Sequence, residues 1–467
     1  HKQNDTVAES EWYKRRTDSS RPDYINDPKE QSAAVKAFAH YNTPAEHYFD
    51  TLGRPILQIE NNGKDELGND ILYYTKAVLD IEGNIRNVID ARNNAVMSYK
   101  YDMLGNMVYQ DSMDAGKRWL LHNAVNNPLR TWDERSHEFR YFYDVLHRPT
   151  ESIVIGGDGI EPLSNTFERI FYGESEIDPE VNNLRGQVFK HYDTGGLIET
   201  PEYDFKGQPK STKRILFKDY KTVANWADSN LTDALETDDF VFVTETDAIG
   251  RITKQTAPDG SIITPGYNEA GLLTSESVHH LNPDRNSTYI VDIDYNEKGQ
   301  RNKITYGNGV TTEYKYDTET FRLKNLVTKR QDNSLLQELH YTYDAVGNIT
   351  HIEDRAIPTV FFNNMRIEPA NEYTYDALYR LIEATGREND SSLSFDSKDN
   401  WNDRPYMHQY NLGDPMAIRD YTQNYVYDEV GNILQMNHTA GSQNSWIRYY
   451  TYDTLTNRLL STKVGNE

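Results

Sequence analysis

Cysteine is absent from the 467-residue chain. This absence excludes disulfides, thiolate nucleophiles and thiolate metal sites, so the fold must rest on packing and backbone hydrogen bonds. Long apolar runs are also missing, since no stretch approaches the roughly 18 to 20 residues that span a bilayer. The polar start His1-Lys2-Gln3 has no apolar signal-peptide core. The sequence therefore predicts no direct membrane insertion.

Positive charge is scarce relative to negative charge. The chain has 49 Lys and Arg against 73 Asp and Glu, which gives a formal net charge of -24. Such a surface repels phosphate backbones and anionic lipids. We therefore expect no nucleic-acid partner, while the acidity itself identifies no other partner.

Motifs for catalysis and for cofactors are also missing. No Gly-x-Ser-x-Gly elbow, phosphate-binding loop or dinucleotide fingerprint occurs, and the 13 histidines include no His-Glu-x-x-His pattern. The pair His279-His280 would alternate across a strand, which favours surface positions. Asp292-Ile293-Asp294 superficially resembles a calcium loop, but Gly299 stands at the wrong position for one. We predict no catalytic residue, cofactor or metal, and hence no enzyme activity.

Tyrosine is abundant, with 34 copies beside 27 Gly and 17 Pro. Tyr favours half-buried strands, and Gly and Pro mark turns. A unit of aromatic residue, Asp, two variable residues, Gly and then Asn, Arg or Gln recurs along the chain. Its complete copies are Phe49-Asp50 with Gly53, Tyr101-Asp102 with Gly105, Tyr203-Asp204 with Gly207, Tyr343-Asp344 with Gly347, and Tyr427-Asp428 with Gly431.

Partial copies fill the intervals between the complete ones. The Gly is kept after Leu79-Asp80, Thr246-Asp247, Tyr267-Asn268 and Tyr295-Asn296, and it is lost after Tyr143-Asp144, Tyr316-Asp317, Tyr375-Asp376 and Tyr452-Asp453. The closely spaced copies lie about 20 to 30 residues apart, which is typical of one hairpin per repeat.

The repeat unit has a physical explanation as a turn. Asp at the first position of a type I turn can accept hydrogen bonds from backbone N–H groups ahead of it, and the Gly can adopt positive φ. The predicted structural turn residues are Asp50, Gly53, Asp102, Gly105, Asp204, Gly207, Asp344, Gly347, Asp428 and Gly431. We assign these carboxylates to hairpin geometry and not to acid–base chemistry.

Tyrosines alternate with other residues before several of these turns. In Tyr373-Thr374-Tyr375 and Tyr425-Val426-Tyr427, the period of two places both rings on one face of the sheet. The predicted aromatic stripe consists of Tyr101, Tyr343, Tyr373, Tyr375, Tyr425 and Tyr427. Packing between strands is its expected role, and sugar stacking remains an alternative.

The predicted organisation is a lead-in followed by one long repeat region. Residues 1–45 form a polar linker with a short helix from Pro28 to Ala39. Residues 46–467 form the repeat region, with insertions near 210–240 and 391–410. A second helix is expected from Tyr220 to Leu235. The predicted fold class is all-β, with hairpins forming a large spiralling antiparallel sheet.

The repeat unit resembles that of the RHS or YD-repeat proteins, over roughly nine tenths of the chain. The segments Phe361-Phe-Asn-Asn-Met-Arg-Ile-Glu-Pro369 and Tyr373-Thr-Tyr-Asp-Ala-Leu-Tyr-Arg-Leu-Ile-Glu-Ala-Thr-Gly-Arg-Glu388 are the most specific. Together with Phe49-Asp-Thr-Leu-Gly-Arg-Pro-Ile56, they are similar to the YD-repeat region of the B component of bacterial insecticidal Tc toxin complexes.

This resemblance implies a structural role in a secreted bacterial toxin. The segment would form part of a hollow shell that encapsulates a cytotoxic C-terminal polypeptide before its delivery into target cells. The implied partners are the C component or a contiguous RHS half with its enclosed toxin, upstream SpvB-like and β-propeller parts, and a pentameric A translocation component. The family's self-cleavage motif is not recognisable near Gly413-Asp414-Pro415, so we assign no protease.

A second hypothesis remains open, namely an extracellular adhesive or carbohydrate-binding YD module like that of teneurin-type receptors. The absence of cysteine favours the toxin shell, because extracellular animal modules commonly use disulfides. The start at His1 and the end soon after Tyr452 suggest a piece of a longer protein. The cargo, the target cell, the organism and the lining of the cavity cannot be read from the sequence.

Overall fold

The computed structural model describes residues 6–227, 231–389, 417–440 and 445–465. Thirty strands belong to one antiparallel sheet, and β25 and β26 form a separate two-stranded hairpin. The predicted all-β antiparallel fold is therefore confirmed. Contacts divide the chain into unit 1 (His1–Tyr99, Ser112–Ala115 and Thr312–Glu467) and unit 2 (Lys100–Asp111 and Gly116–Thr311).

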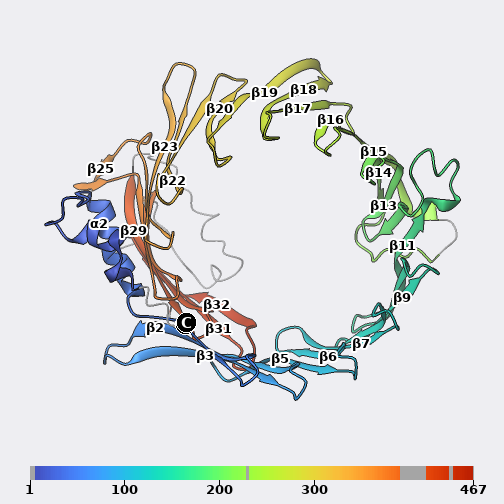
Figure 1. Ribbon diagram of the computed structural model, residues 1–467, viewed down its shortest axis with the longest axis horizontal. Coiled ribbons are helices and arrows are strands. Elements are labelled where there is room, and N and C mark those ends of the chain that lie inside the picture. The colour runs from blue at the N-terminus through green and yellow to red at the C-terminus, as the bar shows by residue number, and fades with distance from the viewer. Residues whose placement is uncertain (1–5, 228–230, 390–416, 441–444, 466–467) are drawn as a thin grey trace. The chain divides into compact units, whose positions relative to one another are not determined.

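Unit 1 begins with short helices and contains the first and last strands of the chain (Figure 1). Its elements are η1 (Val7–Glu9), α1 (Glu11–Thr17), α2 (Pro28–Ala37), η2 (Phe38–His40), β1 (Glu46–Phe49), β2 (Pro55–Lys64), β3 (Asp70–Leu79), β4 (Ile85–Ile89), most of β5 (Ala95–Tyr101), most of β21 (Thr311–Tyr316), β22 (Leu323–Lys329), β23 (Leu335–Tyr343), β24 (Ile349–Asp354), β25 (Val360–Phe362), β26 (Met365–Ile367), β27 (Ala370–Tyr375), β28 (Leu381–Asn389), β29 (Ile418–Tyr427), β30 (Ile433–Thr439), β31 (Trp446–Tyr452) and β32 (Leu459–Val464).

Helix α2 covers part of the sheet of unit 1, beside β23, β24 and β27 (Figure 1). It begins where the Asp27 side chain accepts a hydrogen bond from the Lys29 N–H at 2.9 Å, with Pro28 in the first turn. Its alanines Ala33, Ala34 and Ala37 are fully buried, since small side chains allow the helix to approach the strands closely. The helix predicted from Pro28 to Ala39 is confirmed.

Unit 2 is an antiparallel meander in which each strand pairs with the next. Its elements are most of β6 (Met107–Ser112), β7 (Gly116–His122), β8 (Pro128–Asp133), β9 (His137–Tyr143), β10 (Pro149–Gly156), β11 (Leu163–Tyr172), η3 (Gly173–Ser175), β12 (Val188–Asp193), β13 (Gly196–Tyr203), β14 (Pro209–Phe217), η4 (Leu231–Ala234), β15 (Leu235–Thr246), β16 (Ile252–Thr256), β17 (Ile262–Tyr267), β18 (Leu273–Leu281), β19 (Asp284–Tyr295) and β20 (Arg301–Tyr306).

The main core of unit 2 includes residues of the connection between β14 and β15. Trp226 is fully buried against Tyr192 and Leu197, and its indole N–H donates to the Asp193 carbonyl at 3.0 Å. The helix predicted from Tyr220 to Leu235 is wrong, because the described part of this range is helical only as a 3-10 turn at Leu231–Ala234. The chain is extended at Trp226, so its backbone N–H can donate to the carbonyl of Thr166 in β11.

Most other strand side chains are half-buried, as expected for a sheet that is one layer thick over much of its area. Residues 7–17 and 28–40 of the lead-in form η1, α1, α2 and η2. The insertion predicted near 391–410 lies outside the described residues. No described helix is long and apolar enough to cross a membrane.

Candidate functional site

The Asp of the repeat organises its turn through its carboxylate, and in several copies both carboxylate oxygens accept hydrogen bonds. In the Asp102 turn, Oδ1 accepts hydrogen bonds from the backbone N–H groups of Leu104 and Asn106 at 2.8 and 2.9 Å. The Gly105 N–H donates to the Asp102 carbonyl at 3.1 Å, and the Asp102 N–H donates to the Asn106 carbonyl at 2.9 Å. Each oxygen of this Asp is therefore engaged within its own turn, because Oδ2 accepts from the Asn106 side chain at 3.0 Å.

The other complete copies close in the same way. The backbone N–H groups of Asp50, Asp204, Asp344 and Asp428 donate to the carbonyls of Arg54, Gln208, Asn348 and Asn432. The predicted glycines adopt φ of +79° at Gly53, +80° at Gly105, +79° at Gly207, +115° at Gly347 and +95° at Gly431. The structure thus places all ten predicted turn residues in hairpin turns.

The last residue of the motif has a role that sequence reasoning missed. Its side chain returns to Oδ2 of the Asp, through an amide when it is Asn and through Nε when it is Arg. Asn348 does so at 2.8 Å from Asp344, and Arg380 at 2.6 Å from Asp376. The preference for Asn or Arg at this position was the signal, because the turn backbone alone does not require either side chain.

These contacts favour the ionised aspartates. The amide of Asn106 and its backbone N–H lower the pKa of Asp102 below its usual range. In the more buried Asp344, burial raises the pKa, but His40, Asn348 and backbone N–H groups of the turn outweigh burial and bring the pKa below its usual value. Carboxylates fixed in this way are structural anions and do not serve as proton donors near neutral pH.

Copies without Gly keep the same turn by two routes. His147 and Tyr379 themselves adopt the left-handed backbone, with φ of +61° and +64°. The Asp317 turn is instead one residue longer and closes at the Arg322 carbonyl, at 2.8 Å from the Asp317 N–H. The loss of Gly in the sequence therefore does not mark the loss of a hairpin.

The Tyr that ends a strand directly before a turn, most often before Asp, connects neighbouring turns at seven places. Its hydroxyl donates to the backbone carbonyl of the first residue after the preceding turn. In unit 1 these bonds run from Tyr343 to Leu323 at 2.7 Å, from Tyr375 to Ile349 at 2.9 Å and from Tyr427 to Leu381 at 2.7 Å. In unit 2 they run from Tyr143 to Pro128, from Tyr172 to Pro149, from Tyr203 to Val188 and from Tyr295 to Leu273. We call this series the hydroxyl ladder.

Arginines of the turns stack on the same tyrosines. The Arg148 guanidinium lies 3.8 Å from the ring centroid of Tyr172, and that of Arg380 lies 4.9 Å from the ring centroid of Tyr427. One Arg thus neutralises the Asp of its own turn and covers the Tyr of the next turn. The hydroxyl ladder and the stacked arginines together bind each repeat to its neighbour.

Of the remaining stripe residues, Tyr373 and Tyr425 lie two positions before the turn-proximal tyrosines, whereas Tyr101 lies directly before its turn. Tyr373 and Tyr425 are half-buried, and burial raises the pKa of both phenols. Tyr101 ends β5 and is also half-buried. The structure therefore gives the stripe a packing and hydrogen-bonding role at its turn-proximal positions, Tyr343, Tyr375 and Tyr427.

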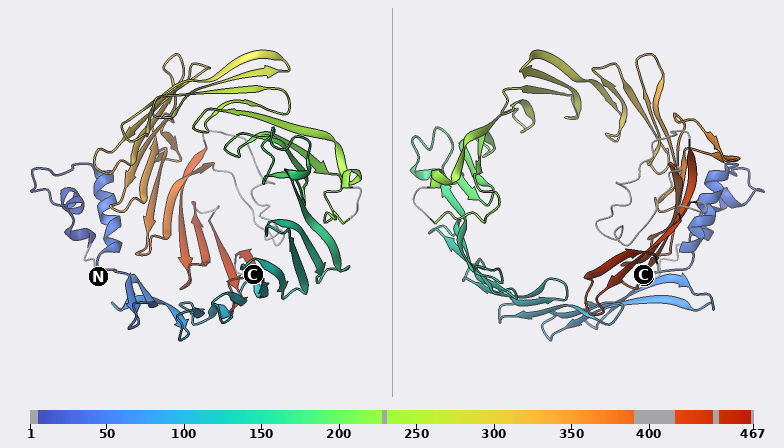
Figure 2. Two further views of the ribbon diagram at one scale, coloured as in Figure 1. Left: turned by 45° about the vertical axis from the view of Figure 1, so that its right-hand side comes forward. Right: turned by 180° about the vertical axis from the view of Figure 1, so that it is seen from behind.

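Within unit 1, the last repeat turns meet the first strands (Figure 2). Arg92 donates to the Asn457 side chain at 2.6 Å and lies 3.6 Å from the Asp428 carboxylate. Asp114 accepts from the Asn457 backbone N–H at 2.7 Å. We call this region the junction, because it joins segments more than 340 positions apart in the chain.

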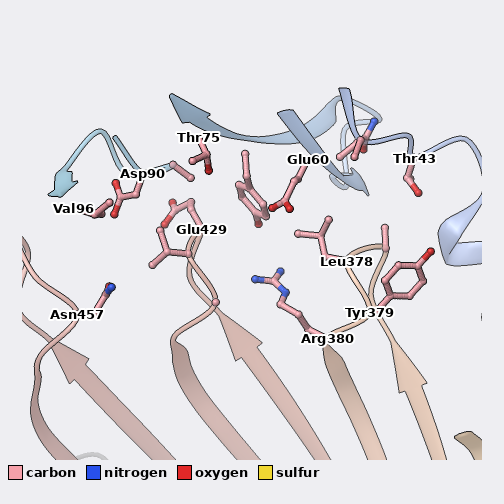
Figure 3. A pocket seen from close by; sticks show the side chains of 17 residues that line it. Thr43, Glu60, Thr75, Asp90, Val96, Leu378, Tyr379, Arg380, Glu429 and Asn457 are labelled. Atoms are coloured by element: carbon pink, nitrogen blue, oxygen red, sulfur yellow. The ribbon is translucent and has the colours of Figure 1, made fainter. Parts of the chain in front are cut away.

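The junction encloses a hollow of about 670 Å³ (Figure 3). Thr75 of β3 lies on one side of it, and Leu378 and Arg380 of a repeat turn lie on the other. Tyr73 and Val430 also line it. The Arg380 guanidinium already contacts Asp376 and the Asp428 carbonyl. Among the described residues, no group of three or more His, Cys, Asp or Glu side chains is arranged to hold a metal.

A buried ionic cluster connects β28, β29 and β30. Arg419 Nη2 lies 2.6 Å from Glu388, and His438 Nε2 lies 3.1 Å from the same carboxylate. The His438 ring stacks on Trp446, with centroids 5.0 Å apart. Burial raises the pKa of Glu388, but His438 and Arg419 outweigh burial, so that this pKa lies below its usual value. The cluster stabilises the last part of the described sheet.

Comparison with known proteins shows which proteins this chain is similar to. No family model matches the chain. The toxin subunit YenC1 of Yersinia entomophaga is 28% identical over 379 residues, which cover 79% of this chain and 38% of YenC1. The toxin subunit YenC2 of the same organism is 29% identical over 433 residues, which cover 86% of this chain and 44% of YenC2. The chain thus spans less than half the length of either relative.

Solved structures agree with the sequence comparison. A crystal structure of TcdB2-TccC3 matches 93% of this chain and 21% of its own chain, with 28% identity and a TM-score of 0.80. The Photorhabdus luminescens Tc holotoxin pore matches the same shares of both chains, with a TM-score of 0.79. The relationship to Tc toxin components that the sequence predicted is confirmed.

Proposed function

We propose that this chain, a homologue of Tc toxin subunits, is a structural shell segment that encloses a cytotoxic polypeptide before delivery into target cells. The observation that carries the proposal is the match to TcdB2-TccC3 over 93% of the chain with a TM-score of 0.80. The sequence relatives YenC1 and YenC2 are themselves named toxin subunits.

The local geometry supports a passive barrier. An antiparallel meander satisfies its backbone hydrogen bonds between strands, so a sheet one layer thick can cover a large area with little core. The repeat carboxylates are occupied within their turns, as at Asp102. Our proposal therefore assigns the repeats no catalytic role.

The proposal extends to partners and location. The chain would assemble with a second repeat-bearing component and its enclosed toxin, with SpvB-like and β-propeller parts, and with a pentameric A component that translocates the cargo. Its bacterial toxin relatives support secretion as the expected route. These finer assignments follow from the resemblance of the repeat unit to the B component of Tc toxin complexes.

Protease protection tests the proposal directly. The full-length protein would be produced together with its repeat-bearing partner and cargo, and the purified complex would be treated with proteinase K. We expect the cargo to remain intact in the folded complex and to be digested after the shell is unfolded in urea. A mass spectrum that shows complete cargo digestion in the folded complex would refute encapsulation. Binding to a glycan array by such a complex would instead favour the adhesive alternative.

A further inference from the structure

One face of unit 2 can be followed from strand to strand through the register. In the pair of β7 and β8, Trp119 lies opposite Trp132, and Leu121 lies opposite Arg130. Arg130 also lies opposite Arg140 of β9. Directly opposed residues point to the same face of a sheet, as do residues two positions apart on one strand. These five side chains therefore share one face, which we call the tryptophan face.

The tryptophan face continues through β10 and β11 to β12 (Figure 1). Phe142 of β9, two positions after Arg140 and hence on the same face, lies opposite Glu151 of β10. Glu151 lies opposite Arg169 of β11, and Arg169 lies opposite Tyr192 of β12. Tyr192 belongs to the main core of unit 2. The tryptophan face and the face that carries this core are therefore continuous.

Beside β11 and β12, an extended segment of the chain itself, residues 223–227, covers this face. The Trp226 backbone N–H donates to the Thr166 carbonyl at 2.7 Å, and Arg169 Nη1 donates to the Trp226 carbonyl at 3.1 Å. Ala224 and Trp226 are fully buried. This face thus holds an extended polypeptide by two kinds of contact, an arginine on a backbone carbonyl and an aromatic side chain packed on the sheet.

Across β7 to β9, the tryptophan face is exposed. Trp119, Leu121 and Phe142 are 41%, 48% and 46% exposed, and all three lie within strands and not at turn tips. Of the described tryptophans, Trp119 alone is more than a third exposed. Its ring lies 5.5 Å from that of Tyr109 in β6. Adjacent exposed aromatic and apolar side chains on one face are typical of a binding surface.

Two arginines of this exposed part share one carboxylate. Arg140 Nε donates to Glu138 at 2.8 Å, and Arg130 Nη1 lies 3.5 Å from the same carboxylate oxygen. Each guanidinium has several N–H donors, so a single carboxylate cannot occupy both groups. Further acceptors, such as backbone carbonyls, can therefore bind here, as the Trp226 carbonyl binds Arg169 on the same face.

We propose that the exposed part of the tryptophan face binds an extended segment of a partner protein that carries an aromatic side chain. This side chain packs against Trp119 and Trp132, and backbone carbonyls of the segment accept hydrogen bonds from Arg130 and Arg140. The occupant is inferred from continuity, because residues 223–227 already lie on the adjoining part of the same face with the same kinds of contact. The inference does not depend on the proposed shell function.

A synthetic peptide tests the chemistry of the site. The probe has the sequence of residues 222–227, Thr-Val-Ala-Asn-Trp-Ala, with fluorescein at its N-terminus, and its binding to the protein is measured by fluorescence anisotropy. The control peptide carries the change Trp226→Ser. We expect the Trp peptide to bind at least about fivefold more tightly than the Ser peptide. Equal affinity of the two peptides, or no binding of the Trp peptide, would overturn the inference.

A matched pair of variants locates the binding. The face variant combines Leu121→Ser and Arg130→Ser, and the control variant combines Arg118→Ser and Leu129→Ser on the opposite face of the same two strands. We expect the face variant to bind the Trp peptide at least about tenfold more weakly than wild type, and the control to bind within about twofold. Equal binding by wild type and the face variant would contradict the assigned site.

Melting temperatures show whether both variants fold. If the face variant unfolds, Arg130→Gln alone replaces it, because the Arg130 side chain is 49% exposed and its loss leaves the apolar contacts in place. We expect this variant to bind the Trp peptide at least about threefold more weakly than wild type. Wild-type affinity in a folded Arg130→Gln protein would refute the role of the arginines.

Photo-cross-linking identifies the natural occupant. A photoreactive phenylalanine analogue would replace Leu121, or Leu129 as the control, in the full-length protein purified with its natural partners. We expect the Leu121 position to cross-link to one segment of a partner that contains Phe, Tyr or Trp, identified by mass spectrometry, and the Leu129 position not to reach that segment. Cross-links to a second copy of this chain or to a glycan, or no cross-links, would overturn the inference.

Discussion

At the residue scale, the tyrosine that ends a strand before a repeat turn contributes both packing and a hydrogen bond. Its ring packs on the sheet while its hydroxyl donates to a backbone carbonyl of the preceding repeat, as Tyr343 does to Leu323 at 2.7 Å. Hydroxyls of half-buried tyrosines need such partners, because a lost hydrogen bond leaves the carbonyl unsatisfied. The hydroxyl ladder thus explains why this position of the motif is so often Tyr and so seldom Phe.

Tyr343→Phe should lower the free energy of unfolding by about 0.5 to 1.5 kcal/mol, because it removes one hydrogen bond and leaves the ring in place. Chemical denaturation of the chain measures this loss. Tyr341→Phe is the control, since its ring stacks on Tyr343 at 6.3 Å and no hydrogen bond from its hydroxyl is found among the described residues. Equal effects of the two substitutions would contradict the ladder.

Gly347→Val should cost about 1 to 2 kcal/mol from the left-handed backbone alone, because φ is +115° there. The cost rises further because a Cβ would lie 2.9 Å from Cζ of Arg322, whose Nη1 donates to the Asp344 carbonyl. A thermal melt tests this expectation. Gly105→Asn serves as the control, since its Cβ would meet nothing within 4 Å and Asn126 already adopts φ of +65° in an equivalent turn. A melt of the Gly347 variant that matches wild type would refute the strain.

At the element scale, hairpins could be predicted from the sequence because their determinants are local. Asp, Gly and alternating Tyr act within a few residues of one another, as in Tyr343-Asp344 with Gly347. The connection from Tyr220 to Leu235 was wrongly predicted as a helix, because its conformation depends on a partner that is distant in the sequence. Trp226 packs against Tyr192 in β12, and such burial overrides the helical composition of the segment.

In the candidate site, too, local features could be predicted from the sequence and long-range contacts could not. The turn residues were evident from their spacing, whereas the hydroxyl ladder joins residues 15 to 46 positions apart, as in Tyr203 to Val188 and Tyr427 to Leu381. The motif contained the donor but gave no indication of the acceptor. The ionic cluster at Glu388 was likewise invisible, because its members lie on three separate strands.

Glu388→Gln should alter the dependence of stability on pH. Because the folded-state pKa of Glu388 is lowered, its ionised form stabilises the fold above the ordinary pKa near 4.5, and this contribution is lost as pH falls through the folded-state value. The variant should be less stable than wild type by about 1 to 3 kcal/mol at pH 7, since Arg419 loses an ionised partner. Below about pH 4 the difference should narrow.

Melting temperatures of both proteins from pH 7 to pH 3 measure this effect. Glu269→Gln, at an exposed turn tip, provides the control and should follow wild type throughout. A difference between wild type and Glu388→Gln that stays constant or widens as pH falls would contradict the assigned role of the cluster.

At the scale of the whole molecule, the repeats are tied together mostly by neighbours, and the junction of unit 1 is the exception. It connects the loop at Asp114 to the turn at Asn457, 343 positions later. Contacts of such long sequence separation form late and cost loop entropy. The junction should therefore be the part of unit 1 that opens first.

Asp114→Ala should remove the hydrogen bond from the Asn457 N–H, while the Arg458 contacts to the Asp114 carbonyl remain. We expect a loss of about 0.5 to 1.5 kcal/mol. Hydrogen–deuterium exchange should show faster exchange in β32 and in the turn before it, with unit 2 unchanged. Glu66→Ala, at an exposed turn tip of unit 1, is the control. Faster exchange spread evenly over both units would contradict a local role for the junction.

The hydroxyl ladder also has an evolutionary consequence. Because each Tyr donates to the strand that follows the preceding turn, a duplicated hairpin brings both its donor and its acceptor with it. Gene segments that encode a hairpin can therefore be copied or deleted without new contacts having to arise elsewhere. Selection can thus lengthen or shorten the sheet by one hairpin at a time, and under the proposed function the length of the sheet sets the room for the enclosed polypeptide.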